Sequence, residues 1–393
     1  MKKLSKTGWK ILFSVAVIIL SGVSALYLTG NGYIIRALQK TYLKGHTTTN
    51  IDDHADFENN VIRAGVPQLW DLHRQYNQIP LTDRLRKELE DNRTIGFAVI
   101  KDGQLWYEEY WEGYSDQRLT NSFSMAKSIT ILLLGKALEE KYIRDMDQPI
   151  TDFIPEFLTD SLGRLCTVGN LSSMTSGFDW TEGYYSPFSP TTEAYYGNHI
   201  ERQLLKRHFS RRPGGHFKYS SADTQLLAIV LKRATGKSLA AYLSEAFWQP
   251  MGMEHDALWS LSGGIEKSFC CVHSNVRDFA KLGQLLLQKG NWNGQQLLDT
   301  AFVERMTTPN EQAFDAGEAK KYGYSIWMDT AYHPAFYGML GLLGQRILVI
   351  PEKNIVIVRL GKAKDNRPTD KGPLDTDNYY MVDEVVAMTE QQP

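Results

Sequence analysis

The sequence contains little cysteine and carries no excess of positive charge. Only three of its 393 residues are cysteine, and 43 lysines and arginines against 45 acidic residues give a formal charge of -2. No basic cluster interleaved with aromatics occurs outside the N-terminus, so nucleic acid is not an expected partner. The spacing of Cys166, Cys270 and Cys271 fits neither a disulfide framework nor a zinc site. We predict three small buried apolar residues, because adjacent cysteines bridge only with strain, and leave open a disulfide that includes Cys166.

Several short motifs that identify common enzyme classes are also missing. The chain has no G-x-S-x-G elbow, no H-E-x-x-H, no Walker A sequence and no G-x-G-x-x-G. The glycines of GMLGLLG, residues 338–344, lie in a strand pattern with no helix after it. These absences argue against an α/β-hydrolase, a zinc peptidase, a P-loop protein and a dinucleotide-binding domain. No metal and no organic cofactor is expected.

The N-terminus combines positive charge with a long uncharged run. Residues 1–10 hold four lysines, and residues 11–30 contain no charge and are about long enough to cross a bilayer. The lysines predict a cytoplasmic N-terminus, a single-pass transmembrane signal anchor over 11–30, and the rest of the chain on the extracytoplasmic, periplasmic side of the cytoplasmic membrane. Two alternatives compete: a signal peptide cleaved after VSA at 23–25, and a buried soluble helix, which fits poorly with a lysine-rich leader.

For the rest of the chain, the sequence predicts a polar linker over residues 31–59 and one domain over residues 60–390. Residues 94–113 alternate apolar and polar side chains around Asp102-Gly103, which predicts a β-hairpin. A second strand pair is expected over residues 342–361, on either side of PEKN. Between them, four stretches show helical spacing of apolar side chains: residues 124–143, 221–236, 238–253 and 274–290. These patterns predict an α+β fold in which an antiparallel sheet built from both chain ends is flanked by helices, with a helical insertion.

One pair of residues in the helical region could carry out nucleophilic chemistry. Ser124 and Lys127 form the only S-x-x-K in the chain, and residues three apart share one face of a helix. A serine hydroxyl needs a base to become a good nucleophile, and a lysine whose pKa is lowered by desolvation can be that base. The helix N-terminus also offers free N–H groups to a developing oxyanion. Alone, the motif is a weak signal, because a serine at a helix start is more often an N-cap.

Two further features lie downstream. PGG at residues 213–215 leads to Tyr219 and then to Ser221 at the start of a helical pattern. A tyrosine at the mouth of a site can pass a proton to a leaving group if a nearby cation lowers its pKa. Within GLLGQRILVI, Gly344 would let an acyl group lie along the strand while a main-chain N–H binds the oxyanion. The structural alternatives are a buried aromatic before a serine-capped helix, and a glycine at a strand bulge.

In this order and spacing, these features resemble the serine β-lactamase and penicillin-recognising hydrolases. The resemblance includes TVGNLSSMTSGFDW (167–180), GGIEKSFCCVHSNVRDFAKLGQLLL (263–287) and YGYSIWM (322–328). These stretches look like the branch of class C β-lactamases, esterases and 6-aminohexanoate-dimer hydrolases, the last most of all. The resemblance implies Ser124 as acylated nucleophile, Lys127 as its proton acceptor and Tyr219 as acid/base for the leaving group. It also implies an oxyanion hole made by the main-chain N–H groups of Ser124 and Gln345.

Two departures from the family pattern bear on the substrate. The family's Y-x-N is Y-S-S here, so Ser221 replaces an amide that contacts substrate. Its K-T-G is Leu342-Leu343-Gly344, without the lysine that anchors the carboxylate of a β-lactam or a D-alanyl peptide.

We therefore predict a membrane-anchored serine hydrolase of small linear amides or esters, with Ser221, Gly344 and Gln345 in contact with the substrate. The tyrosines of residues 183–199 suggest an aromatic wall. The alternatives are a D,D-peptidase or β-lactamase, and a non-catalytic envelope binding protein that retains this fold.

Overall fold

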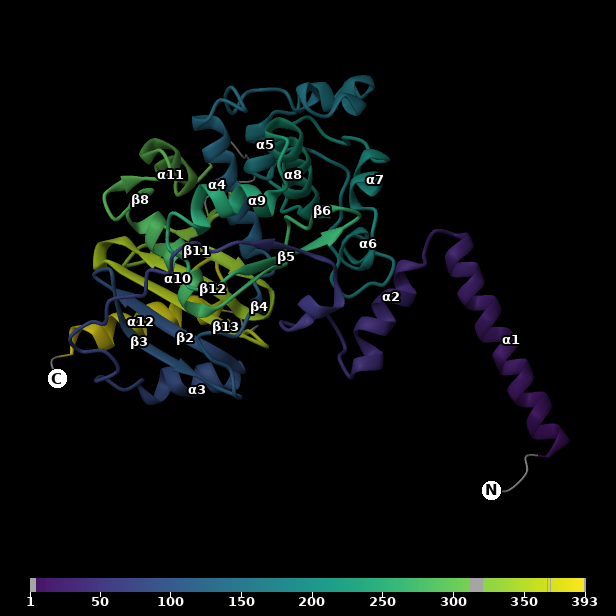
Figure 1. Cartoon of the computed structure of the whole chain (residues 1–393), viewed down its shortest axis with the longest axis horizontal. Helices are drawn as coiled ribbons and strands as arrows, with labels where there is room; N and C mark the ends of the chain where they lie inside the picture. The colour runs from purple at the N-terminus through teal and green to yellow at the C-terminus, as the bar shows by residue number, and fades with distance from the viewer. Residues whose placement is uncertain (1–4, 311–320, 366, 368, 392–393) are drawn as a thin grey trace.

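A sheet built from both ends of the chain forms the centre of the fold. The computed structural model describes residues 5–310, 321–365, 367 and 369–391. Six antiparallel strands follow the order β10-β11-β12-β13-β2-β3. Their bounds are β2 Thr94–Lys101, β3 Gln104–Tyr110, β10 Trp327–Asp329, β11 Phe336–Gly341, β12 Gln345–Ile350 and β13 Ile355–Gly361. The pairing of β13 with β2 joins the two chain ends (Figure 1), which confirms the predicted α+β fold.

Both predicted strand pairs are present, and local sequence explains their turns. Asp102 (φ 53°) and Gly103 (φ 77°) close the β2-β3 hairpin in the left-handed conformation. Glycine adopts this conformation freely and aspartate at modest cost. A short turn over Pro351–Lys353 and a left-handed Asn354 (φ 52°) join β12 to β13 in the same way.

The two faces of the sheet pack against different helices. Successive side chains of a strand point to opposite faces, so Ala98 and Ile100 join one hydrophobic core while Phe97 and Val99 join another. Helix α10 (Val276–Leu287) covers the first face, and α3 (Asp83–Asp91) and α12 (Thr376–Glu390) cover the second. Because both faces are covered, β12 and β13 are buried along their whole length, which explains their continuous apolar runs.

Helices inserted between the strands form the rest of the domain. Helix α4 (Met125–Glu139) is buried along most of its length and packs against α8 (Ser221–Thr235) and α9 (Leu239–Leu243). The helix expected over 238–253 is interrupted, because α9 ends at Leu243 and continues as a π-helical turn over Ser244–Trp248. The shorter elements are α5 Val168–Ser172, α6 Pro190–Tyr196, α7 Ile200–Leu205, α11 Thr300–Met306, β8 Asn291–Trp292 and β9 Gln295–Gln296.

A second, smaller antiparallel sheet holds the chain where it enters α4. Its strands follow the order β1-β5-β7-β4, with β6 paired to β5. Their bounds are β1 Asn59–Ile62, β4 Thr120–Asn121, β5 Ala257–Ser262, β6 Ile265–Glu266 and β7 Val272–Ser274. Because β4 ends three residues before Ser124, this sheet fixes the approach to the first turn of α4.

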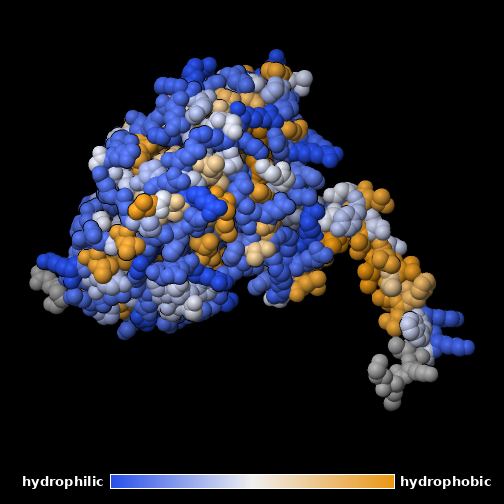
Figure 2. All heavy atoms as spheres, in the orientation of Figure 1, coloured by the Kyte–Doolittle hydropathy of each residue, from blue (hydrophilic) through white to orange (hydrophobic). Residues whose placement is uncertain are grey.

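The N-terminal helix α1 (Lys6–Leu28) stands away from the domain (Figures 1 and 2). None of its residues is buried, and Figure 2 shows it as a largely hydrophobic rod. Among the described residues it is the one helix long and apolar enough to span a bilayer. By length and composition it fits a membrane anchor or a signal sequence.

Residues 31–59 are packed against the domain, which differs from the linker expected from the sequence. Helix α2 (Tyr33–Lys40) contacts α6, and both Ile51 and Asp53 are buried. The polar composition concealed this packing because Asp53 is held by hydrogen bonds from Asn121 and Tyr195 rather than by apolar contacts. The folded part of the chain thus extends to the N-terminal side of residue 60.

Candidate active site

Ser124 lies in the turn that precedes α4. Its side chain makes no N-cap hydrogen bond, and its Oγ instead accepts one from Lys127 Nζ at 3.1 Å. Its main-chain N–H has no hydrogen-bond partner in the part of the chain that the structure describes. The preceding residue, Phe123, has φ 45°, a region that non-glycine residues seldom occupy. An N–H without a partner among the described residues, a hydroxyl bonded to Lys127 rather than to the helix backbone, and an unusual backbone distinguish Ser124 from a helix cap.

Lys127 is buried one turn into α4, with 2 % of its surface exposed. Besides the contact with Ser124, its Nζ donates a hydrogen bond to the main-chain oxygen of Phe269 at 2.8 Å. Burial lowers the pKa of Lys127 to about 8, and the charge of Glu182 opposes this shift. Since desolvation disfavours the ammonium form, a sizeable fraction of this amine is neutral at physiological pH.

Tyr219 comes from the segment before α8 and meets the same two residues. Its ring centroid lies 4.9 Å from Lys127 Nζ, and Tyr219 and Ser124 line the same cavity. Burial raises the pKa of Tyr219 above its ordinary value, so the phenol stays protonated. From the sequence we expected a nearby cation to lower the pKa of Tyr219. The raised pKa found in the structure instead keeps the phenol protonated, as a proton donor requires. The structure brings together Ser124, Lys127 and Tyr219, as expected.

Ser221 borders the site, but Gly344 and Gln345 lie outside it. The turn Leu342–Gly344 separates β11 from β12, and a Cβ at Gly344 would lie 1.7 Å from Arg359 Nη1, away from the site. The main-chain N–H of Gln345, which the resemblance implied as an oxyanion donor, is bonded to the Leu342 oxygen, and its buried side chain donates to the oxygens of Leu342 and Gly361.

The end of β11 takes the place that the sequence suggested for Gly344. From this part of the chain, Leu340, Gly341 and Leu342 line the cavity next to Ser124. Gly341 comes so close to the Ser124 turn that a Cβ there would lie 2.4 Å from the Ser122 oxygen. Gly341 stands three residues before Gly344 in GMLGLLG, so the sequence contained a signal for it, but only the strand ends show which glycine faces the serine.

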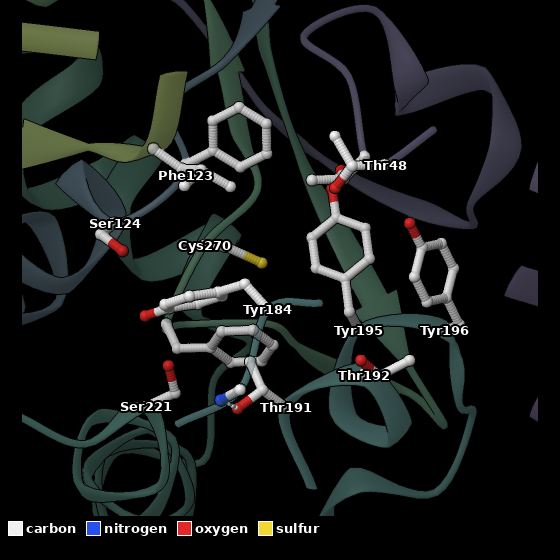
Figure 3. A pocket seen from close by; sticks show the side chains of 14 residues that line it. Thr48, Phe123, Ser124, Tyr184, Thr191, Thr192, Tyr195, Tyr196, Ser221 and Cys270 are labelled. Atoms are coloured by element: carbon white, nitrogen blue, oxygen red, sulfur yellow. Dashed lines mark hydrogen bonds between the residues drawn. The ribbon is translucent and has the colours of Figure 1, made fainter. Parts of the chain in front are cut away.

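Two cavities meet at Ser124. We call the first, of about 60 Å³, the aromatic cavity (Figure 3); apart from Ser124 and Leu342 it is lined by Thr48, Thr49, Phe123, Gly183, Tyr184, Thr191, Thr192, Tyr195, Tyr196, Ser221, Phe269 and Cys270. The second, of about 300 Å³, is the cationic cavity; its lining includes Tyr219, Lys321, Trp327, Arg346, Lys364 and Asp375. Ser124, Tyr184 and Leu342 border both. The aromatic wall predicted over 183–199 is therefore present.

Glu182 is a carboxylate that the sequence did not single out. It accepts hydrogen bonds from Trp180 Nε1 at 2.9 Å and from the main-chain N–H of Ser221 at the start of α8. Its position after the TSGFDW stretch gave no hint of the contact with Ser221, because that residue lies 39 positions further along the chain. No group of three His, Cys, Asp or Glu side chains among the described residues is arranged to hold a metal ion.

The cysteine prediction was wrong for the adjacent pair. Cys270 and Cys271 form a disulfide, while Cys166 is free and buried. The backbone at Cys271 is left-handed, φ 73°. Cys270 lines the aromatic cavity (Figure 3) and follows Phe269, whose oxygen accepts a hydrogen bond from Lys127. The disulfide therefore lies next to the wall of the site.

The fold and this site place the chain in the class of serine hydrolases. Residues 82–377 match the family model described as Beta-lactamase, and the chain belongs to the β-lactamase family, as the sequence motifs indicated. The 6-aminohexanoate-dimer hydrolase of Paenarthrobacter ureafaciens is 26% identical over 298 residues, which cover 72% of this chain and 76% of that protein. A protein of Escherichia coli K12, provisionally assigned as a D-alanyl-D-alanine carboxypeptidase, is 22% identical over 381 residues, with 76% and 87% covered.

A solved structure supports the same fold. The structure of a Bacillus anthracis protein, provisionally assigned as a 6-aminohexanoate-dimer hydrolase, superposes with a TM-score of 0.73 at 23% identity. The match covers 91% of this chain and 95% of that chain.

Proposed function

We propose that this protein is a membrane-anchored hydrolase that cleaves small linear amides or esters through an acyl-Ser124 intermediate, with its catalytic domain outside the cytoplasmic membrane. The observation that carries the proposal is the contact of 3.1 Å between Ser124 Oγ and the buried amine of Lys127. A base with a pKa of about 8 is close to the operating pH at which a general base is most effective. The apolar helix α1 supports the anchor, and the lysines that precede it support its orientation.

The proposed reaction has two half-reactions in which bonds and protons balance. Ser124 Oγ attacks the carbonyl carbon while Lys127 Nζ takes the hydroxyl proton, and Tyr219 donates its proton to the leaving nitrogen or oxygen as the scissile bond breaks. The protonated lysine then returns a proton to the tyrosine. In the second half-reaction, water attacks the acyl-enzyme, loses a proton to the same groups, and Ser124 is released with its proton.

The oxyanion needs main-chain donors next to Ser124. The first is the N–H of Ser124, which has no hydrogen-bond partner among the residues that the structure describes. For the second we propose a main-chain N–H at the end of β11, within Leu340–Leu342, rather than that of Gln345. The support is that these residues border the cavities at Ser124 and that Gly341 packs against the serine turn.

The position of Tyr219 indicates which cavity holds the acyl group of the substrate and which holds its leaving group. Tyr219 lines the cationic cavity, so the leaving group lies there and the acyl group lies in the aromatic cavity. Arg346 is paired with Asp375 and Asp377, and Lys364 with Asp375. Together with Lys321 the cations of the cationic cavity still exceed these carboxylates, which favours a leaving group that carries a carboxylate. A dimer of 6-aminohexanoate, the substrate named for the relative from Paenarthrobacter, is a linear amide with such a leaving group.

A second candidate function is supported by the same cations. The missing lysine of the K-T-G box argued against a D,D-peptidase or β-lactamase, but Lys364 and Lys321 offer other partners for the carboxylate of those substrates. Stable acylation of Ser124 by a penicillin, seen as an increase in intact mass, would favour this function over linear-amide hydrolysis.

Hydrolysis by the full chain in detergent micelles tests the proposal. We expect turnover of a short-chain p-nitrophenyl ester and of linear amides of 6-aminohexanoate, together with an acyl adduct on Ser124 detected by intact mass. Ser124→Ala should abolish both. Equal background rates for the folded wild-type protein and this variant, with no adduct, would favour a non-catalytic binding protein.

Lys364→Ala tests the carboxylate-binding role of the cationic cavity. Lys364 lines the cationic cavity and is part-exposed, and its Nζ lies 2.8 Å from Asp375 Oδ2. Because it would lose one charged partner of the substrate carboxylate, the alanine variant should show a KM about fivefold to tenfold higher for an amide with an anionic leaving group. The same amide with its carboxylate converted to a neutral carboxamide should show no change, and Lys364→Arg should retain the discrimination. Equal effects on both substrates would contradict the assignment.

A further inference from the structure

The chain segment that follows the apolar helix reaches into the wall of the active site. Thr48 and Thr49 line the aromatic cavity, about twenty residues after α1 ends at Leu28 (Figure 3). Ile51 is buried in the main hydrophobic core, and its main-chain oxygen accepts a hydrogen bond from the N–H of Asn121 at 2.8 Å. This segment is therefore part of the catalytic domain and contacts the strand that leads to Ser124.

Asp53 anchors this segment through a buried hydrogen-bond network. Its Oδ2 accepts hydrogen bonds from Tyr195 Oη at 2.5 Å and from Thr49 Oγ1 at 3.0 Å. Its Oδ1 accepts one from Asn121 Nδ2 at 3.0 Å. Asp53, Asn121 and Tyr195 are all buried, so these hydrogen bonds fix one arrangement of the side chains.

The network ends at the turn that carries the serine. Asn121 Oδ1 accepts a hydrogen bond from the main-chain N–H of Phe123 at 2.9 Å. Phe123 has the left-handed backbone, φ 45°, that precedes Ser124 and leaves the N–H of Ser124 free. A non-glycine residue stays in this conformation only when its surroundings hold it there, and the Asn121 amide is positioned to do so.

Burying the carboxylate of Asp53 costs free energy, and simple hydrophobic packing of this segment would not need it. Burial raises the pKa of Asp53, and the charge of Lys267 and the three hydrogen-bond donors oppose that shift. Lys267 is also buried; its Nζ donates to the main-chain oxygen of Tyr195 at 2.7 Å and lies 3.4 Å from the Phe57 ring centroid. Burial of a carboxylate costs free energy unless hydrogen bonds compensate it, and those of Asp53 come from Tyr195, Thr49 and Asn121, so they also fix the position of Asn121 beside the serine turn.

We propose that Asp53 is a positioning residue of the active site, which acts through Asn121 on the turn that carries Ser124. The proposal rests on the proposed function of Ser124 as nucleophile and extends it, because it makes the segment after the apolar helix a working part of the site. Asp53 does not touch the substrate or Ser124. It determines how often the turn presents the hydroxyl and the free N–H of Ser124 in the reactive arrangement.

An exchange of donor and acceptor tests this role. Asn121→Asp places a second carboxylate next to Asp53 and removes the amide donor between them, whereas the double variant Asp53→Asn/Asn121→Asp restores one amide facing one carboxylate and the cluster's net charge. In both variants an oxygen of residue 121 can still accept the N–H of Phe123. In the full chain in micelles we measure the rate at which a fluorophosphonate labels Ser124, per folded molecule, with the folded fraction taken from the thermal transition. We expect about a tenfold or larger loss in the single variant and recovery to near the wild-type rate in the double variant.

Asp56→Asn is the matched control, and Asp53→Asn is a milder variant for the case in which Asn121→Asp does not fold. Asp56→Asn alters an acidic residue of the same segment that pairs with Lys44 and does not contact Asn121, and it should label at the wild-type rate. If Asn121→Asp does not fold, Asp53→Asn replaces it and should label more slowly per folded molecule. Labelling that falls only with the folded fraction overturns the proposal, as does a folded double variant that stays slow. A wild-type chain that is not labelled would instead contradict the nucleophile assignment itself.

Discussion

Replacing Lys127 by alanine should lower kcat for a p-nitrophenyl ester about a thousandfold, with the protein still folded. The amine is the one base in contact with Ser124 Oγ among the described residues, and loss of a general base typically costs between a hundredfold and ten-thousandfold. Steady-state turnover, with the burst of p-nitrophenol measured separately, shows whether acylation is the step affected. A variant with undiminished turnover would rule out the proposed base.

Two comparisons separate base catalysis from a simple effect of charge. Lys127→Arg keeps the positive charge but cannot become neutral in the working range, so it should be as slow as the alanine variant. Lys136→Ala removes a lysine further along α4 that pairs with Glu139, and it should retain full activity. Combining Lys127→Ala with Tyr219→Phe should cost little more than the first change alone, because the three residues act as a unit.

The loss of activity should not come from unfolding. A pKa lowered from 10.5 to about 8 by burial means that the native state holds the protonated amine at a cost of roughly 3 kcal/mol. Lys127→Met avoids this cost at pH 7, and its free energy of unfolding should be at least that of the wild type. In the wild type, the unfolded chain binds more protons between pH 8 and 10, so this group makes stability rise with pH in that interval.

The rate of acylation should rise about fiftyfold between pH 6 and pH 8 and level off above. Only neutral Lys127 can accept the serine proton, and with a pKa of about 8 roughly one molecule in a hundred is neutral at pH 6 and one in two at pH 8. The limb should appear in kcat/KM, which reports the free enzyme. The raised pKa of Tyr219 keeps the phenol protonated over the whole range. A flat profile between pH 6 and pH 8 would contradict this assignment.

Glu182→Gln provides the matched test of the pH dependence. The charge of Glu182 raises the pKa of Lys127, so its removal should move the ascending limb to lower pH. A glutamine oxygen can still accept a hydrogen bond from the N–H of Ser221, which preserves the start of α8. An unshifted limb in a folded variant would show that Glu182 does not reach Lys127 electrostatically.

Much of the fold could be predicted because its signals are local. The hairpin at Asp102-Gly103 needs only two residues with left-handed backbone, and the continuous apolar runs of β12 and β13 follow from burial on both faces. Two expectations failed for reasons that sequence cannot show. The segment 31–59 is polar yet packed, since hydrogen bonds from Asn121 and Tyr195 compensate Asp53. Cys270 and Cys271 are bridged, with a left-handed backbone at Cys271 that the sequence does not indicate.

The candidate site shows the same division between local and distant contacts. Ser124 and Lys127 were predictable because they are one helical turn apart, and Tyr219 because of its motif and position after them. The choice of Gly344 and Gln345 did not hold, since it depended on where β11 ends and β12 begins. The ends of these two strands are set by their pairing across the hairpin, which no short stretch of sequence encodes.

The sequence by itself determined the α+β fold, the apolar N-terminal helix and the serine-lysine-tyrosine set, because periodicity, charge and motif order are properties of the chain alone. Only the tertiary structure decided that Gly341 rather than Gly344 faces Ser124 and that Lys321, Arg346 and Lys364 gather on the side of Tyr219. It also decided that Asp53, seventy-one residues before Ser124, connects to its turn. These contacts join residues far apart in the chain, and they form only when the sheet, the helices and the N-terminal segment pack together.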